Sequence, residues 1–521
     1  MIRCDILVIG TGLAGCTAAI TAAEQGQNVL MITKTPDMMS GNTCHAQGGI
    51  IYQGPSGNPE LLIQDIRQAG DGICYEPAVR QLAVQGPDLV KHFLIDRLNV
   101  DFDRTPSGDL DLTMEGAHSE ARIIHHKDST GYSIHQSVLE CARTHPGIKI
   151  LTDHTAIDLL TLSHHSRELK DIYQKPACFG IQVLNNLSGD VYPILARKTI
   201  LATGGIGRLY LHSSNPREAT GDGIALAWRA GARCFNLQYV QFHPTTLYVD
   251  KERFLISESL RGEGARLITH EGKSFMERFH AMKELAPRDV VARAIYQTML
   301  DLDHACVYLD ISHKDADWIK NRFPSIYTTC LESGINITTQ PIPVVPAAHY
   351  FCGGVGINLN GRTSLRRLYA VGEVACSGLH GANRLASTSL LECVVWGHRA
   401  GMDAAADQES DNYFPPIYDW IYETEDMDPA LIAQDWLTIK NTMWNYVGLI
   451  RTPQRLNRAR TILRHLQSEI EIFYKKVKLS RSIIQLRNGI QTAIAITQAT
   501  LEARQNRGAH FLQSEFPASN P

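Results

Sequence analysis

The sequence lacks the cysteine patterns that mark metal clusters and disulfide scaffolds. Its 521 residues include twelve cysteines, but no two of them form a C-x-x-C motif. Neither a zinc site nor an iron–sulfur cluster is therefore expected, and His125-His126 lacks a third metal ligand at suitable spacing. A chain of this length does not depend on a disulfide framework, so the scattered cysteines indicate a reducing, cytoplasmic location.

The sequence also lacks an excess of charge of one sign and any long apolar run. The 50 Lys and Arg residues nearly balance the 54 Asp and Glu residues, which predicts no basic surface for nucleic acid or for an anionic membrane. No apolar stretch is long enough to span a bilayer. The first apolar strand begins within a few residues of Met1, so no signal peptide is expected.

A glycine-rich loop near the N-terminus is the first feature that points to a ligand. The apolar run Ile6–Ile9 leads into Gly10-Thr-Gly-Leu-Ala-Gly15, and an Ala-rich segment follows. A strand, a tight glycine turn and a helix start form a pyrophosphate-binding unit, because the first N–H groups of the helix face the anion.

The second predicted strand ends differently from that of an NAD-binding unit. It ends in Thr33-Lys34, where such units carry an Asp or Glu that binds the ribose. Two further apolar strands end at Gly204-Gly205 and at Gly372-Glu373. Glycines permit close backbone approach, so this pattern indicates a sheet that touches a flat cofactor at several points.

The order of strands and helices predicts an α/β protein with three domains. We expect a Rossmann-like domain from residues 1–232 and 347–408, interrupted by an α+β capping domain at 233–346. Residues 409–428 contain Pro415-Pro416 and acidic side chains, as a linker would. Apolar residues at helical spacing then predict a helical domain over 429–508, followed by a poorly ordered tail.

Two charged segments stand out as candidates for a polar site. Glu115-Gly-Ala-His-Ser119 places charge and imidazole beside small residues. Arg384 lies among Gly, Ala and Ser residues, which leave room for a carboxylate held by two guanidinium N–H groups. On its residues alone, Glu115 is interpreted as an ordinary surface carboxylate.

Seven features in order, from Asp5 to about Ala404, resemble the succinate dehydrogenase and fumarate reductase flavoprotein family. They are Gly10–Gly15, Ala46–Gly49, Gln241–Thr245, Leu260–Gly264, Pro287–Asp289, His349 and the segment around Arg384. The Glu115 segment resembles the branch of the family that oxidises L-aspartate. That branch has Glu-Gly-Gly-His-Ser, and here its second glycine is Ala117.

The resemblance implies FAD as the cofactor, which accounts for Thr33-Lys34. The positions matching the family's FAD contacts are Thr11, Gly12, Leu13, Ala14, Lys34, Asn42, Thr43, Cys44, His45, Ala46, Gln47, Gly48, Gly49, Asp222, Glu373, Ser389 and Leu390. Dehydrogenase-type relatives join a histidine covalently to the flavin, and the matching position here is Asn42. His45 is out of register, so we expect a non-covalent flavin.

The resemblance also implies the catalytic residues, which are Glu115, His243, Arg288, His349 and Arg384. The two histidines and Arg384 would hold a four-carbon dicarboxylate, Glu115 the ammonium group, and Arg288 would exchange a proton. A guanidinium stays protonated near neutral pH. Either a nearby carboxylate, Glu258 or Glu263, relays the proton or Arg288 acts as an electrostatic clamp.

The implied reaction oxidises L-aspartate to iminoaspartate and reduces O2 to hydrogen peroxide, with fumarate as an alternative acceptor. The product would feed quinolinate synthesis and hence NAD, which implies a functional link to quinolinate synthase. We expect a cytoplasmic monomer or homodimer. The alternatives are a soluble fumarate reductase or succinate dehydrogenase flavoprotein, an NAD-dependent dehydrogenase, and a flavin-binding scaffold whose C-terminal helices engage a partner.

Overall fold

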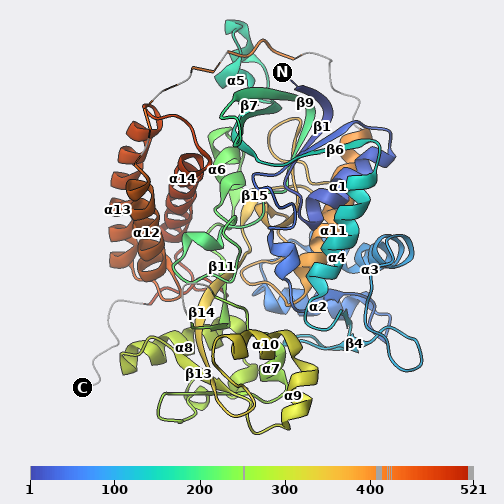
Figure 1. Cartoon of the computed structure of the whole chain (residues 1–521), viewed down its shortest axis with the longest axis vertical. Helices are drawn as coiled ribbons and strands as arrows, with labels where there is room; N and C mark the ends of the chain where they lie inside the picture. The colour runs from blue at the N-terminus through green and yellow to red at the C-terminus, as the bar shows by residue number, and fades with distance from the viewer. Residues whose placement is uncertain are drawn as a thin grey trace.

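The computed structural model describes residues 2–249, 253–406, 414–418, 420–421, 423, 425–426 and 428–513. An α/β domain, a smaller domain below it and a helical bundle beside it make up the molecule (Figure 1). The predicted α/β architecture with an inserted α+β domain and C-terminal helices is confirmed. Across the described ranges, no helix is both long enough and apolar enough to cross a membrane.

The α/β domain is built on a seven-stranded sheet. Its strands are β6 (Ile148–Leu151), β2 (Val29–Ile32), β1 (Ile2–Ile9), β9 (Val191–Leu201), β8 (Cys178–Asn185), β7 (His154–Thr161) and β16 (Leu368–Ala370). Four of these strands end level, because Ile9 pairs with both Ile32 and Leu201, and Leu201 pairs with Ala370 in parallel register. The segments that follow them therefore meet at one edge of the sheet, where open α/β folds bind ligands.

Helices α1 (Leu13–Glu24) and α11 (Thr388–Ala406) pack closely on this sheet. Every residue of α1 except the last is buried, which its small side chains permit. Gly10 has a φ of +118°, and a Cβ atom at Gly15 would overlap the Gly10 carbonyl oxygen. The domain also carries α2 (Pro59–Ala69), α3 (Glu76–Leu89) and α4 (Thr130–Thr144).

The inserted domain has its own antiparallel sheet and its own core. The sheet has the order β11 (Val240–Leu247), β14 (Ile342–Phe351), β13 (Val307–Asp310) and β12 (Arg266–Ile268). Its helices are α7 (Glu258–Gly262), α8 (Arg288–Leu302), α9 (Ala316–Arg322) and α10 (Pro324–Glu332). Strands β11 and β14 connect it to the α/β domain, and they carry His243 and His349.

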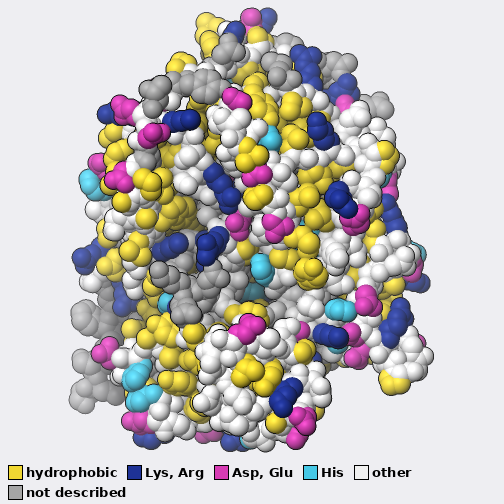
Figure 2. Space-filling model, viewed as in Figure 1, with side chains coloured by type: hydrophobic (Ala, Val, Ile, Leu, Met, Phe, Trp, Pro, Cys, Tyr) yellow, Lys and Arg dark blue, Asp and Glu magenta, His cyan; other side chains and the backbone are white. Residues whose placement is uncertain are grey.

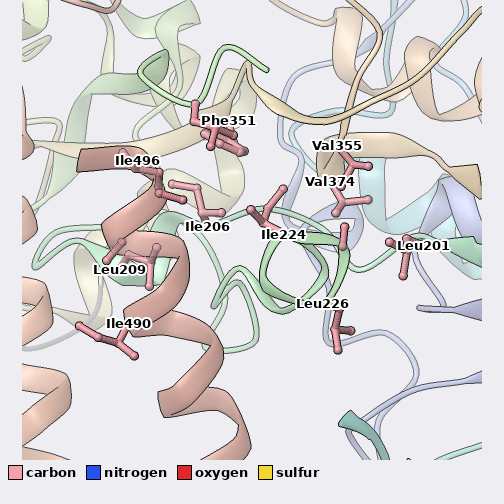
Figure 3. Close-up of a cluster of buried hydrophobic side chains, with 14 of the residues drawn as sticks. Leu201, Ile206, Leu209, Ile224, Leu226, Phe351, Val355, Val374, Ile490 and Ile496 are labelled. Carbon is pink, nitrogen blue, oxygen red and sulfur yellow. The ribbon is translucent and has the colours of Figure 1, made fainter. Parts of the chain in front are cut away.

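The C-terminal bundle consists of α12 (Pro429–Val447), α13 (Pro453–Tyr474) and α14 (Arg481–Glu502). Ile490 and Ile496 of α14 share a hydrophobic cluster with Ile224 of α6 (Asp222–Arg229), as Figure 3 shows.

The prediction of a poorly ordered tail is wrong for residues 508–513. Ala509 N donates to Ala382 O at 3.0 Å, and His510 is buried. Residues 514–521, and part of the predicted linker 409–428, lie outside the described residues.

The contact between α1 and α11 gives a prediction about stability. A Cβ atom at Gly401 would lie 2.6 Å from the Ala18 carbonyl oxygen, so Gly401→Leu forces the two helices apart. We expect the free energy of unfolding to fall by about 1–3 kcal/mol, as for other overpacked cores. Chemical denaturation followed by circular dichroism measures this change.

Ala406→Leu, at an exposed position of the same helix, is the matched control and should leave the unfolding free energy within about 0.5 kcal/mol of wild type. Equal stability of the Gly401→Leu variant and wild type would show that the helices do not depend on this close approach.

Candidate functional site

A cavity lies where the level strands end, and it continues to the inserted domain. Figure 2 shows one face of the molecule, with Lys, Arg, Asp and Glu side chains around the middle of the view. Of the residues expected to bind cofactor or substrate, all but Cys44 line the cavity. Cys44 does not, because in the tight turn 42–45 its thiol turns back and donates to Met39 O at 2.8 Å.

The N-terminus of α1 forms one wall of the cavity. Gly12 caps this helix without a side-chain hydrogen bond, and no acidic residue lies in the first turn. Thr43 Oγ1 accepts from Leu13 N at 3.1 Å and so joins the glycine loop to the 42–45 turn. Because no acidic residue lies in the first turn, the N–H groups of this helix start other than Leu13 N can bind a phosphate.

Lys34 is held beside the same wall by residues at the start of α6. Its Nζ donates to Glu218 O at 2.8 Å and to Asp222 Oδ2 at 2.5 Å. The other Asp222 oxygen accepts from Asn488 Nδ2 of α14 at 3.0 Å. The helical bundle thereby helps to orient a carboxylate of the α/β domain.

Several polar atoms in the cavity wall fit a bound FAD. The buried Gln47 Oε1, Thr203 Oγ1 and Asn215 Oδ1 have no hydrogen-bond partner within the described chain, so a polar ligand can satisfy them. Glu373 accepts from Asn42 Nδ2 at 2.7 Å and from Phe351 N at 3.0 Å, and burial raises its pKa to about 7.

Arg384 lines the cavity, and its guanidinium hydrogen-bonds to neutral groups. It donates to Ser389 Oγ at 3.0 Å and Gln241 Oε1 at 3.3 Å, and its Cζ lies 4.4 Å from the centre of the Tyr350 ring. Burial, with nearby Arg288 adding to it, lowers the pKa of this guanidinium. These neutral partners leave its positive charge available to an anionic ligand.

The two histidines lie beside this arginine, with their ring centres 5.2 Å apart. Arg384 Nη2 lies 3.2 Å from His349 Nε2, and His349 Nδ1 lies 2.9 Å from Ser214 Oγ. Burial lowers the pKa of His243 and of His349 well below the usual value, and the neighbouring arginines add to the effect. Both rings are therefore neutral near pH 7.

Arg288 projects from the start of α8 and forms an ion pair inside the cavity. Its Nε donates to Glu258 Oε2 at 2.5 Å. Although burial acts to raise it, the guanidinium groups of Arg288 and Arg261 lower the pKa of Glu258 to about 2. Glu263, the other carboxylate considered as a proton relay, instead lies 3.6 Å from Arg322.

Glu115 faces this ion pair from the α/β domain. Its Oε2 accepts from Ser387 Oγ at 2.7 Å, and Ser387 has a positive φ of 56°. Burial raises the pKa of Glu115, and the charge of Arg288 partly opposes this shift. A Cβ atom at Gly116 would overlap Glu258 Oε1, so the Glu115 loop touches the inserted domain.

Sequence reasoning assigned no role to three side chains that shape this site. Ser387 orients Glu115, Gln241 contacts both Arg288 and Arg384, and Tyr350 lies under Arg384. The only signal for them was their position beside or within recognised motifs, since Gln241 begins one and Tyr350 follows His349.

Comparisons with known proteins agree with this site. The family model described as "FAD binding domain" matches residues 5–390. L-aspartate oxidase of Pseudomonas aeruginosa is 43% identical over 519 residues, covering 97% of this chain and 94% of that protein. L-aspartate oxidase 1 of Ralstonia nicotianae is 42% identical over 523 residues, covering 99% of this chain and 96% of that protein.

Two solved structures share the fold over most of the chain. Sdh1 of Mycobacterium smegmatis is 28% identical with a TM-score of 0.81, covering 98% of this chain and 89% of that chain. A quinol-fumarate reductase is 25% identical with a TM-score of 0.86, covering 99% of this chain and 93% of that chain. The family model matches most of the chain, and the curated relatives are 42% and 43% identical to it over nearly its full length. The chain therefore belongs to the L-aspartate oxidase family and is an FAD-dependent oxidoreductase.

Proposed function

We propose that this chain oxidises L-aspartate to iminoaspartate, with O2 reduced to hydrogen peroxide and fumarate as an alternative acceptor. The observation that carries the proposal is the placement of Glu115 opposite Arg288 and Arg384 in one cavity. Arg384 and Arg288, the latter held by Glu258, match the two carboxylates of L-aspartate, and Glu115 matches its ammonium group. L-Aspartate loses two electrons and two protons, and bound FAD supplies the two-electron acceptor.

The arginines and histidines would bind the dicarboxylate. Arg384 offers N–H groups whose present partners are neutral, so a substrate carboxylate competes with them on favourable terms. His349 positions Arg384 through the contact between their nitrogen atoms. Because His243 and His349 are neutral, they add hydrogen-bonding capacity without repelling the arginines.

Glu115 would distinguish L-aspartate from succinate and fumarate, which lack the ammonium group. Burial disfavours its charged form, and an ammonium group beside it would restore that form. The hydrogen bond from Ser387 orients the carboxylate before substrate arrives. This preorganisation reduces the entropy that binding must overcome.

Arg288 would act at the reacting end of the substrate. Its ion pair with Glu258 fixes the guanidinium from the inserted domain, and the low pKa of Glu258 keeps that partner charged. Arg288 is therefore preorganised as an electrostatic clamp. If a proton passes through this pair, Glu258 rather than Glu263 is the carboxylate in position to accept it.

The product would be consumed in quinolinate synthesis, on the route to NAD. An imine of this kind hydrolyses readily in water, so a functional link to quinolinate synthase would benefit the cell.

The substrate assignment predicts the outcome of anaerobic flavin reduction. L-Aspartate should bleach the flavin absorbance faster than succinate at equal concentration, because only L-aspartate engages Glu115. Stopped-flow absorbance measures both rates. Faster reduction by succinate would favour the dehydrogenase alternative instead.

Replacing the carboxylate that would bind the ammonium group gives a second prediction. Glu115→Gln should lower kcat/KM for L-aspartate by at least about 30-fold, equivalent to about 2 kcal/mol, and lower fumarate reduction much less. Glu263→Gln removes a carboxylate that lies outside the cavity lining and serves as the control. Equal losses with L-aspartate and fumarate would mean that Glu115 does not bind the amino group.

The raised pKa of Glu115 also predicts how wild type responds to pH. Glu115 is charged above that pKa and protonated below it, so KM for L-aspartate should rise as the pH falls through this range. KM for fumarate should change less over the same range. Steady-state kinetics at several pH values measures both, and a parallel rise would contradict the assignment.

Whether the flavin is covalently bound can be tested without measuring enzyme activity. Asn42 stands at the position of the covalent histidine and is occupied by its hydrogen bond to Glu373. Acid precipitation should therefore release the flavin into the supernatant, where its absorbance is measured. A yellow protein pellet would instead show a covalent bond from another residue, such as His45.

A further inference from the structure

The two halves of the substrate site belong to different domains. Glu115 and Arg384 are carried by the α/β domain, whereas Glu258 and Arg288 are carried by the inserted, capping domain. Gly116 approaches Glu258 so closely that a Cβ atom there would overlap it. Small changes in the position of the capping domain therefore change the spacing of the substrate-binding charges.

A carboxylate of the α/β domain joins the two domains at the start of α10. Asp128 Oδ2 accepts from Ser325 N at 2.9 Å, and Asp128 Oδ1 accepts from Ser325 Oγ at 2.6 Å. Asp128 is only 9% exposed. A buried carboxylate that accepts two hydrogen bonds at a helix N-terminus forms a strong, oriented contact.

Both partners in this contact are firmly anchored. Ser325 lies between Phe323 and Ile326, which belong to the core of the capping domain. On the other side, Asp128 lies two residues before Thr130, the first residue of α4, whose hydroxyl donates to Gly48 O. The contact thus connects the core of the capping domain to the loop that lines the cofactor end of the cavity.

The opposite edge of the capping domain is held differently. Arg293 of α8 donates to Gly508 O at 3.3 Å, and its Cζ lies 5.0 Å from the centre of the Phe511 ring. This edge remains tied to the C-terminal segment when the Asp128 contact is lost. Loss of Asp128 would therefore free the α10 edge alone and let the domain tilt.

We propose that Asp128 is a positioning residue that holds the capping domain closed over the substrate site through Ser325. Asp128 does not line the cavity. It acts only by raising the fraction of free enzyme molecules in which the capping domain is closed. When that fraction falls, the apparent affinity for substrate falls by the same factor, while turnover of bound substrate is preserved. The proposal rests on the proposed function only for the choice of substrate.

The test compares two holoenzyme variants that each remove a carboxylate from a helix start. Asp128→Ala removes the contact between domains. Asp315→Ala removes the cap of α9, which accepts from Asp317 N at 3.1 Å and Trp318 N at 2.9 Å inside the capping domain. Both variants lose a helix cap, but only the first loses the connection to the α/β domain.

We expect Asp128→Ala to raise KM for L-aspartate about tenfold, the equivalent of about 1.4 kcal/mol, with kcat within about twofold of wild type. Asp315→Ala should lower Tm without this rise in KM. Asp128→Asn keeps one acceptor oxygen and should restore part of the affinity. Adding Ser325→Ala to Asp128→Ala should raise KM no further, because Ser325 acts through Asp128.

Hydrogen exchange of the substrate-free holoenzyme tests closure without any assumption about the substrate. Amides at the start of α10 and in the Glu115 loop should exchange faster in Asp128→Ala, whereas in Asp315→Ala the Glu115 loop should exchange as in wild type. Unchanged exchange in the Glu115 loop, an unchanged KM, or an equal KM rise in Asp315→Ala would overturn the proposal. If wild type fails to oxidise L-aspartate, the proposed function fails while the exchange result still decides the role of Asp128.

Discussion

The shared register of four parallel strands is the constraint on which the rest of the molecule depends. Ile9, Ile32, Leu201 and Ala370 end their strands level with one another, so four connecting segments leave the sheet at one edge. The glycine loop, Lys34, the Gly204-Gly205 pair and Glu373 meet there because of this alignment. A one-residue slip in any of these pairings would turn its side chains to the other face and separate these groups.

Charge is distributed unevenly along the cavity that results. At the cofactor end, Lys34 is neutralised by Asp222, and the start of α1 supplies a partial positive charge. At the substrate end, buried Arg384 has neutral partners and Arg288 shares one carboxylate with Arg261. Unpaired buried charge is costly to the fold, and a dicarboxylate substrate compensates for it. Part of the stability of the protein is therefore given up for substrate affinity.

Sequence patterns predicted the sheet and the glycine loop because these depend on local periodicity and on a motif that the backbone geometry dictates. The catalytic residues were implied only by the resemblance to a known family, because no local pattern distinguishes Glu115 or Arg288 from ordinary surface residues. Sequence patterns did not predict the direction of Cys44, since the tight helical turn at residues 42–45 places neighbouring side chains on different sides. Nor did they predict the pairing of Asp128 with Ser325, 197 residues further along the chain, because no motif marks either residue. The packing of residues 508–513 was missed for the same reason. Contacts between distant segments depend on how whole domains dock.

That C-terminal segment has a consequence for the way the molecule is made. Ala509 is hydrogen-bonded to Ala382, two residues before Arg384, and Arg451 lies 2.6 Å from His510. During synthesis the glycine loop at residues 10–15 leaves the ribosome long before residues 508–513. A nascent chain can therefore form the cofactor wall while its support for Arg384 is still unmade. Until residues 508–513 have emerged, the segment that carries Arg384 lacks the hydrogen bond from Ala509 N to Ala382 O.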